Sequence, residues 1–121
     1  MNSVAEVADL APIMQTLVTR ALACGSVCRT ELDDGITLFA YPSETEILIG
    51  IGIHRDNLNV YTIETALSRR FASPRRYACW LPALFADGGF YVMQRRDAST
   101  VGGVHGPSTE EISDALALFA A

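Results

Sequence analysis

Five side chains of the chain are of types that bind metal ions or act as nucleophiles and bases: Cys24, Cys28, Cys79, His54 and His105. Three residues separate Cys24 from Cys28, where a zinc-binding pair usually has two to four and a second close pair follows; here no second pair follows. A catalytic cysteine needs a neighbouring base, but Cys79 lies in an apolar run and His105 in a glycine-rich one. We therefore expect no metal site and no catalytic residues, and hence a protein that is not an enzyme.

Two glycines in the stretch ILIGIGIH, residues 47–54, resemble the start of a phosphate-binding loop. A dinucleotide loop has the pattern G-x-G-x-x-G between a strand and a helix, and this chain has Arg55 at the third glycine position. Isoleucines on both sides of Gly50 and Gly52 favour a strand instead. We expect no cofactor here. The two glycines should form a strip covered by the first helix of the chain, with close approach by a bound partner as the alternative.

The periodicity of apolar residues predicts an α+β fold of order αβββαββα, with a mainly antiparallel twisted sheet packed with helices. The first helix starts at the Ser3-x-x-Glu6 capping pattern with a kink at Pro12, or else at Asp9. It should end before Gly25. A second helix is expected through residues 60–71, and a third after a capping box at residues 108–111. One domain spans residues 1–121.

Alternating residues predict the strands and their two faces. Asp34-Gly35 indicates a hairpin between the first two strands. Residues 36, 38 and 40 share one face of the second strand, and the isoleucines of ILIGIGI share one face of the third. The runs RYACWL (Arg76–Leu81) and FYVMQRR (residues 90–96) predict the last two strands, and LPALFA between them fits either strand or helix. Phe39, Tyr41 and Leu48 make the second sheet face apolar as well.

Composition limits the classes of partner. The formal net charge is −5, the pI is about 4.8 and all nine basic residues are Arg. Acidity argues against nucleic acid and against anionic membrane surfaces. The pairs Arg69-Arg70, Arg75-Arg76 and Arg95-Arg96 are therefore expected to pair with carboxylates. No signal peptide or membrane span is predicted, three cysteines suit a reducing compartment, and the Arg-only usage points to a GC-rich bacterium. We expect a bacterial cytoplasmic protein.

The apolar surplus suggests protein binding. Half of the residues are hydrophobic, which is more than a chain of 121 residues easily buries by itself. A sheet that is apolar on both faces can hold an extended polypeptide.

The order of elements resembles that of the class I type III secretion chaperones, the Tir chaperone family. The likeness runs through the Asp34-Gly35 hairpin, the strand ILIGIGI, the helix through Ile63 and Leu67, the runs RRYACWL and GGFYVMQRR, and the helix STEEISDALALF. It implies a virulence-associated homodimer that binds the unfolded N-terminal segment of a secreted effector in extended form and keeps it soluble and secretion-competent.

Site residues follow from the same resemblance. The second helix and the strand after it would form the dimer interface through Ile63, Leu67, Tyr77 and Trp80. The first helix and the sheet would contact the effector through Leu17, Leu38, Phe39 and Leu48. The alternative is a non-catalytic adaptor or regulatory subunit of similar fold that binds a folded protein.

Overall fold

The computed structural model describes residues 3–32, 35–54, 56, 60–98 and 105–119. Three helices and five strands follow in the order α1 (Ser3–Cys24), β1 (Cys28–Glu31), β2 (Ile36–Pro42), β3 (Glu46–Ile53), α2 (Val60–Ala72), β4 (Leu81–Leu84), β5 (Phe90–Asp97) and α3 (Thr109–Phe119). The strands form one antiparallel sheet of order β1-β2-β3-β5-β4. The predicted α+β class and the order αβββαββα are confirmed.

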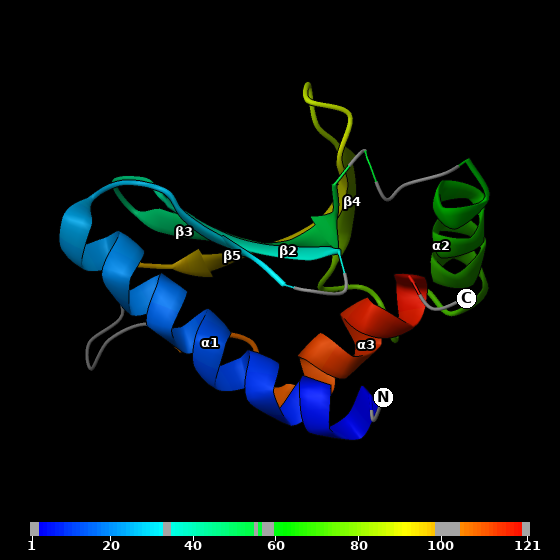
Figure 1. Ribbon diagram of the computed structural model, residues 1–121, viewed down its shortest axis with the longest axis horizontal. Helices are drawn as coiled ribbons and strands as arrows, with labels where there is room; N and C mark the ends of the chain where they lie inside the picture. The colour runs from blue at the N-terminus through cyan, green and yellow to red at the C-terminus, as the bar shows by residue number, and fades with distance from the viewer. Residues whose placement is uncertain (1–2, 33–34, 55, 57–59, 99–104, 120–121) are drawn as a thin grey trace.

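The core lies between one face of the sheet and the helices α1 and α3 (Figure 1). Ile47, Ile49 and Ile51 of β3 are completely buried on this face, together with Leu38 of β2. Alternate residues of a strand point to opposite faces, so burying the isoleucines directs Leu48, Gly50 and Gly52 to the other face. The predicted division of β2 and β3 into two faces is therefore confirmed.

Helix α1 begins at Ser3 and continues through Pro12, so the alternative start at Asp9 is wrong. Pro12 has no backbone N–H to donate, and its carbonyl accepts a 3.0 Å hydrogen bond from the Thr16 hydroxyl. The helix ends at Gly25, as expected. Gly25 adopts a φ of 67°, and its N–H donates to the carbonyl of Ala21 at 2.8 Å.

The hairpin between β1 and β2 closes through Gly35, whose φ of 87° favours glycine. The N–H of Leu32 donates to the carbonyl of Ile36 at 2.7 Å, and the N–H of Gly35 donates to the carbonyl of Leu32 at 3.1 Å. Asp34 lies outside the described residues.

The strand expected at Arg76–Leu81 is wrong: residues 74–79 form turns, and β4 begins only at Leu81. Tyr77 and Trp80 are both buried, with exposed fractions of 3% and 0%. Residues three apart point to opposite faces of a strand but to the same side of a helical turn, so the turn buries both rings. Pro82, which cannot donate to a ladder, lies in the edge strand β4.

Helix α2 packs mainly against α3, on the side of α3 away from α1 (Figure 1). Two arginines of α2 tie the helix to its surroundings, Arg69 to α3 and Arg70 to the segment before β4. The guanidinium of Arg69 donates to the carbonyl of Ala117 at 2.7 Å, near the end of α3. Arg70 Nε donates to the carbonyl of Trp80 at 2.9 Å. The charge of Arg69 at the C-terminal end of α3 also complements the helix dipole.

Helix α3 begins with the predicted capping box. The N–H of Glu111 donates to Ser108 Oγ at 3.1 Å, and the N–H of Ser108 donates to Glu111 Oε1 at 3.0 Å. In the part of the chain described, no helix is both long and apolar enough to cross a membrane.

Candidate binding surface on the open face of the sheet

The sheet face opposite α1, here called the open face, carries side chains in rows across the strands. Register pairs Phe39 of β2 with Gly50 of β3, and Gly50 with Met93 of β5. One row further along are Thr37, Gly52 and Tyr91; on the other side are Tyr41, Leu48 and Arg95. The open face is thus apolar in its middle, as the sequence predicted.

Aromatic rings fill the space above both glycines of β3. A Cβ added at Gly50 would overlap the ring of Phe39, and one at Gly52 would overlap the ring of Tyr91 and the backbone oxygen of Phe90. The expectation that α1 covers this strip is therefore wrong, because α1 packs on the isoleucine face. Side chains of the neighbouring strands approach both glycines, and at Gly52 the backbone of β5 approaches closely as well.

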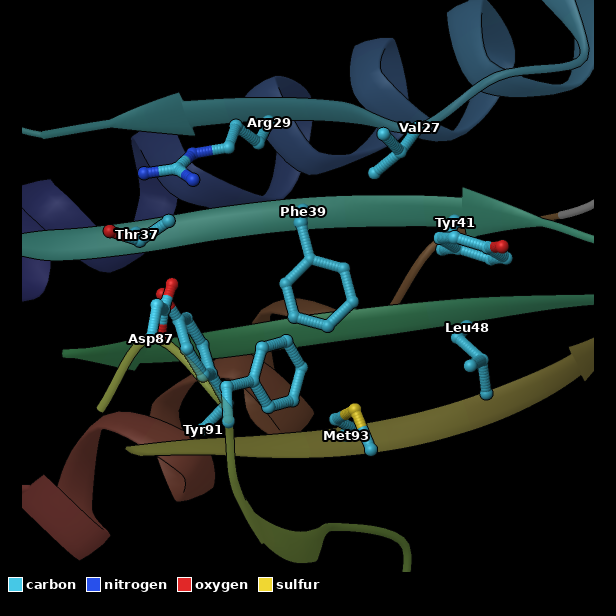
Figure 2. Close-up of a pocket in the computed structure, with 10 residues that line it drawn as sticks. Val27, Arg29, Thr37, Phe39, Tyr41, Leu48, Asp87, Tyr91 and Met93 are labelled. Carbon is cyan, nitrogen blue, oxygen red and sulfur yellow. The ribbon is translucent and has the colours of Figure 1, made fainter. Parts of the chain in front are cut away.

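The rings of Phe39 and Tyr91 lie close to the backbone at the two glycines, and a hollow of ≈ 390 Å³ remains on the open face (Figure 2). Phe85 completes an aromatic cluster, with ring centroids 5.6 Å from Phe39 and 4.5 Å from Tyr91. The centroids of Phe39 and Tyr91 are 5.6 Å apart. Phe85 reaches the hollow because the β4–β5 turn folds back: the N–H of Phe85 donates to the carbonyl of Gly89 at 2.8 Å.

The hollow has an apolar end and a polar end (Figure 2). Val27, Tyr41, Leu48 and Met93 lie toward the apolar end, and Arg29, Thr37 and Asp87 lie toward the polar end. An apolar lining with a few convergent polar groups is typical of a binding site.

Charges at the polar end are arranged around Arg29 and Asp87. Arg29 pairs with Glu31 at 2.5 Å, on the same face of β1. Asp87 Oδ1 accepts a 2.8 Å hydrogen bond from the N–H of Gly89. Burial, and next the charge of Asp87, raise the pKa of Tyr91, so its phenol remains a neutral donor.

Of the residues expected to contact an effector, two line the hollow: Phe39 and Leu48. Leu17 and Leu38 are in the core, with exposed fractions of 5% and 0%, which corrects the expectation that they face a partner. Leu38 follows the β2 alternation inward, and Leu17 lies on the buried side of α1. Sequence reasoning missed Tyr91 and Phe85. The sequence contained a signal for Tyr91, because a glycine in one strand often pairs with an aromatic residue of the neighbouring strand, and Tyr91 of β5 is the partner of Gly52.

Of the residues expected at a dimer interface, Leu67 is the one well exposed to solvent, with an exposed fraction of 44%. Ile63 is half-buried against the core, while Tyr77 and Trp80 are buried in the protomer itself. Trp80 Nε1 donates to the carbonyl of Glu111 at 2.9 Å, so its polar edge is already satisfied. Phe71, one helical turn after Leu67, is 88% exposed and was not among the residues expected at the interface.

The histidines and cysteines are distributed over separate parts of the fold. All three thiols are free, and burial, followed by the charge of Glu111, raises the pKa of Cys79. His54 Nδ1 lies 3.3 Å from the carboxylate of Asp56. Among the described residues, no three His, Cys, Asp or Glu side chains are grouped closely enough to hold a metal ion.

The arginine pairs mostly serve the fold, as expected from the charge balance. Arg96 donates to both carboxylate oxygens of Glu111 at 3.0 Å, and Arg76 Nε donates to Asp114 at 2.8 Å. Arg95 lies 3.9 Å from Glu46. Arg69 and Arg70 also bind backbone carbonyls, which was not expected from the sequence.

Compared with known proteins, the chain matches no family model, no curated protein and no solved structure.

Proposed function

We propose that this chain is a bacterial cytoplasmic secretion chaperone of the class I type III kind, and not an enzyme. It binds the N-terminal segment of a secreted effector in extended form, and so keeps the segment soluble and competent for export. The single observation that carries this proposal is the hollow on the open face. Residues from β1, β2, β3, β5 and the β4–β5 turn line it, so four of the five strands build this surface.

The physical chemistry of the hollow supports a polypeptide ligand. Covering apolar surface stabilises a complex by roughly 25 cal/mol per Å² removed from water. An extended segment presents every second side chain to the sheet and so matches rows that repeat every two residues. Ordering a disordered segment costs several kcal/mol. Contacts in the hollow of ≈ 390 Å³ offset this cost best when the segment also contacts the neighbouring rows of the open face.

A homodimer formed through α2 is part of the same proposal. Leu67 and Phe71 lie on one side of α2, four residues apart, and both are exposed. Exposed aromatic and aliphatic side chains on one helix face are typical of an interface. Light scattering should give twice the monomer mass of 13.1 kDa.

The test of function is co-expression with the product of the neighbouring open reading frame, followed by limited proteolysis. We expect the N-terminal segment of that product to be protected by the chain and cut in its absence. Tyr41→Asp and Leu48→Asp should abolish protection. Leu84→Asp, at an exposed position of β4 outside the hollow, is the matched control and should not.

Two outcomes would contradict the chaperone proposal. If only folded proteins bind, the adaptor alternative is correct. If the open-face variants protect the segment as well as the unmodified chain does, the effector binds elsewhere.

A further inference from the structure

The open face carries a charge pattern in addition to its apolar rows. Glu31 of β1 is the register partner of Thr37, and Arg29 is the partner of Phe39. Glu31 and Thr37 thus belong to the row of Gly52 and Tyr91, at the polar end. The row of Tyr41 and Leu48 lies four residues away along β2, at the apolar end.

The polar end has one more carboxylate than guanidinium. Arg29 is already paired with Glu31, and its guanidinium points toward the Thr37 end in Figure 2. Among the described residues, the partner of the Asp87 carboxylate is the backbone N–H of Gly89 and not a cationic side chain. The charges of Asp87 and Glu31 raise the pKa of the buried phenol of Tyr91, and the charge of Arg29 opposes them. The whole chain, at −5, adds to the same field.

Rows two residues apart impose a spacing on any extended ligand that lies along the strands. Its residues i, i+2 and i+4 face the sheet, and each reaches a successive row. The first two of these rows carry the apolar side chains of Leu48 and Phe39, with Arg95 in the first and Arg29 in the second. The third row contains Glu31 and lies at the end of the hollow that Asp87 lines.

We infer that the hollow selects extended segments with two apolar residues at alternate positions and a Lys or Arg at the next alternate position, before or after them. The apolar side chains occupy the rows of Leu48 and Phe39, and the cation reaches the carboxylates of Asp87 and Glu31. This inference rests on the proposed function and specifies the chemistry of its ligand. An acidic residue at the same position would meet like charge and bind less well.

The test uses fluorescein-labelled peptides of twelve residues with Gly and Ser flanks, measured by anisotropy at low and high salt. The first peptide has the core Leu-Ser-Phe-Ser-Lys, and the second has the reversed core. The third replaces Lys by Glu. The fourth, Leu-Ser-Phe-Lys-Ser, has the same composition as the first but turns the cation away from the sheet.

We expect the first or second peptide to bind about two- to fivefold more tightly than the third and fourth at low salt, with the preference shrinking as salt rises. Asp87→Asn, which keeps an acceptor for the N–H of Gly89, should remove the preference without abolishing binding. Asp87→Lys should reverse it in favour of the Glu peptide.

Equal affinities for all four peptides would overturn the inference and leave the proposed function intact. So would a preference that Asp87→Asn does not change. If no peptide binds while the effector segment is still protected, recognition occurs elsewhere and the inference is wrong. If neither the peptides nor the effector segment binds, the proposed function fails as well.

Discussion

The ring of Phe39 occupies the space in which a side chain at Gly50 would lie, across the β2–β3 pair. Glycine in a strand usually weakens the strand, because it packs nothing and has more backbone freedom in the unfolded chain. Here an aromatic ring of the neighbouring strand supplies the missing packing. Because Gly50 has no side chain, the ring of Phe39 lies close to the backbone of β3, and this sets the depth of the hollow.

Substituting the two glycines by alanine should destabilise the protein to different extents. At Gly50 the methyl group meets the outer atoms of the Phe39 ring, which can rotate toward the hollow. At Gly52 it also meets the backbone oxygen of Phe90, which cannot move without distorting the β3–β5 ladder. We expect about 1–2 kcal/mol for Gly50→Ala and about 3 kcal/mol for Gly52→Ala in urea unfolding.

A double-mutant cycle checks the cause at Gly50. Phe39→Leu makes room above the strand, so Gly50→Ala should cost much less in that background. A Gly52→Ala variant as stable as Gly50→Ala would show that the Phe90 carbonyl does not limit the site.

Replacing Leu67 by Asp should dissociate the proposed dimer while leaving the protomer folded. The side chain is 44% exposed in the protomer, so the charge meets water in the monomer and apolar surface in the dimer. We expect the dissociation constant to rise roughly thirtyfold or more, as at an interface hot spot. Sedimentation velocity measures the change, and Phe71→Ser should act in the same direction.

Leu84→Asp is the control for this experiment, because it places the same charge at another exposed leucine. An unchanged dimer in both α2 variants would move the interface away from α2.

Lowering the pH should remove the stabilisation that ionised Glu111 provides. Burial alone would raise its pKa, but the N–H of Ser108 and the charge of Arg96 outweigh burial and lower it. A lowered folded-state pKa means that this stabilisation is complete above the unfolded value, about 4.3, and is lost as pH falls through the folded value. Unfolding measured from pH 6 to pH 3 should therefore show a shallower decline in Glu111→Gln.

Glutamine keeps an acceptor for the N–H of Ser108, so this variant tests the charge and not the cap. Glu110→Gln removes a carboxylate from the same helical turn and serves as the control. Equal pH profiles for the unmodified chain and Glu111→Gln would contradict the prediction.

Trp80→Phe should cost about 1–3 kcal/mol. The change removes the hydrogen bond from Nε1 to the carbonyl of Glu111 and leaves space in a completely buried position. Because Trp80 is the single tryptophan of the chain, stability is measured by circular dichroism in this variant. A loss under about 0.5 kcal/mol would show that neither the hydrogen bond nor the extra volume of the indole contributes much to stability.

Alternation along β2 and β3 was enough to predict the sheet and its two faces. A run such as ILIGIGI has a strict period of two, and one face must cover the core. Capping residues likewise predicted the end of α1 at Gly25 and the start of α3 at Ser108. Each of these features is determined by residues close together in the sequence, so the sequence alone is enough to predict it.

The hollow could be predicted only in part, because it depends on register between distant strands. Phe39 and Leu48 were found from β2 and β3, but Tyr91 and Phe85 enter from β5 and the turn before it. The turn at Tyr77 and Trp80 was missed for a related reason. A run of aromatic and small residues fits a strand locally, and only the burial of both rings against the core favours the turn.

Helix α3 is held differently at its two ends. Near its start, Arg96 binds the carboxylate of Glu111, which acid can protonate. Near its end, Arg69 binds the carbonyl of Ala117, which has no proton to gain. Acidification therefore weakens the ion pair that joins the first turn of α3 to β5. Loosening of α3 in acid should begin at this first turn.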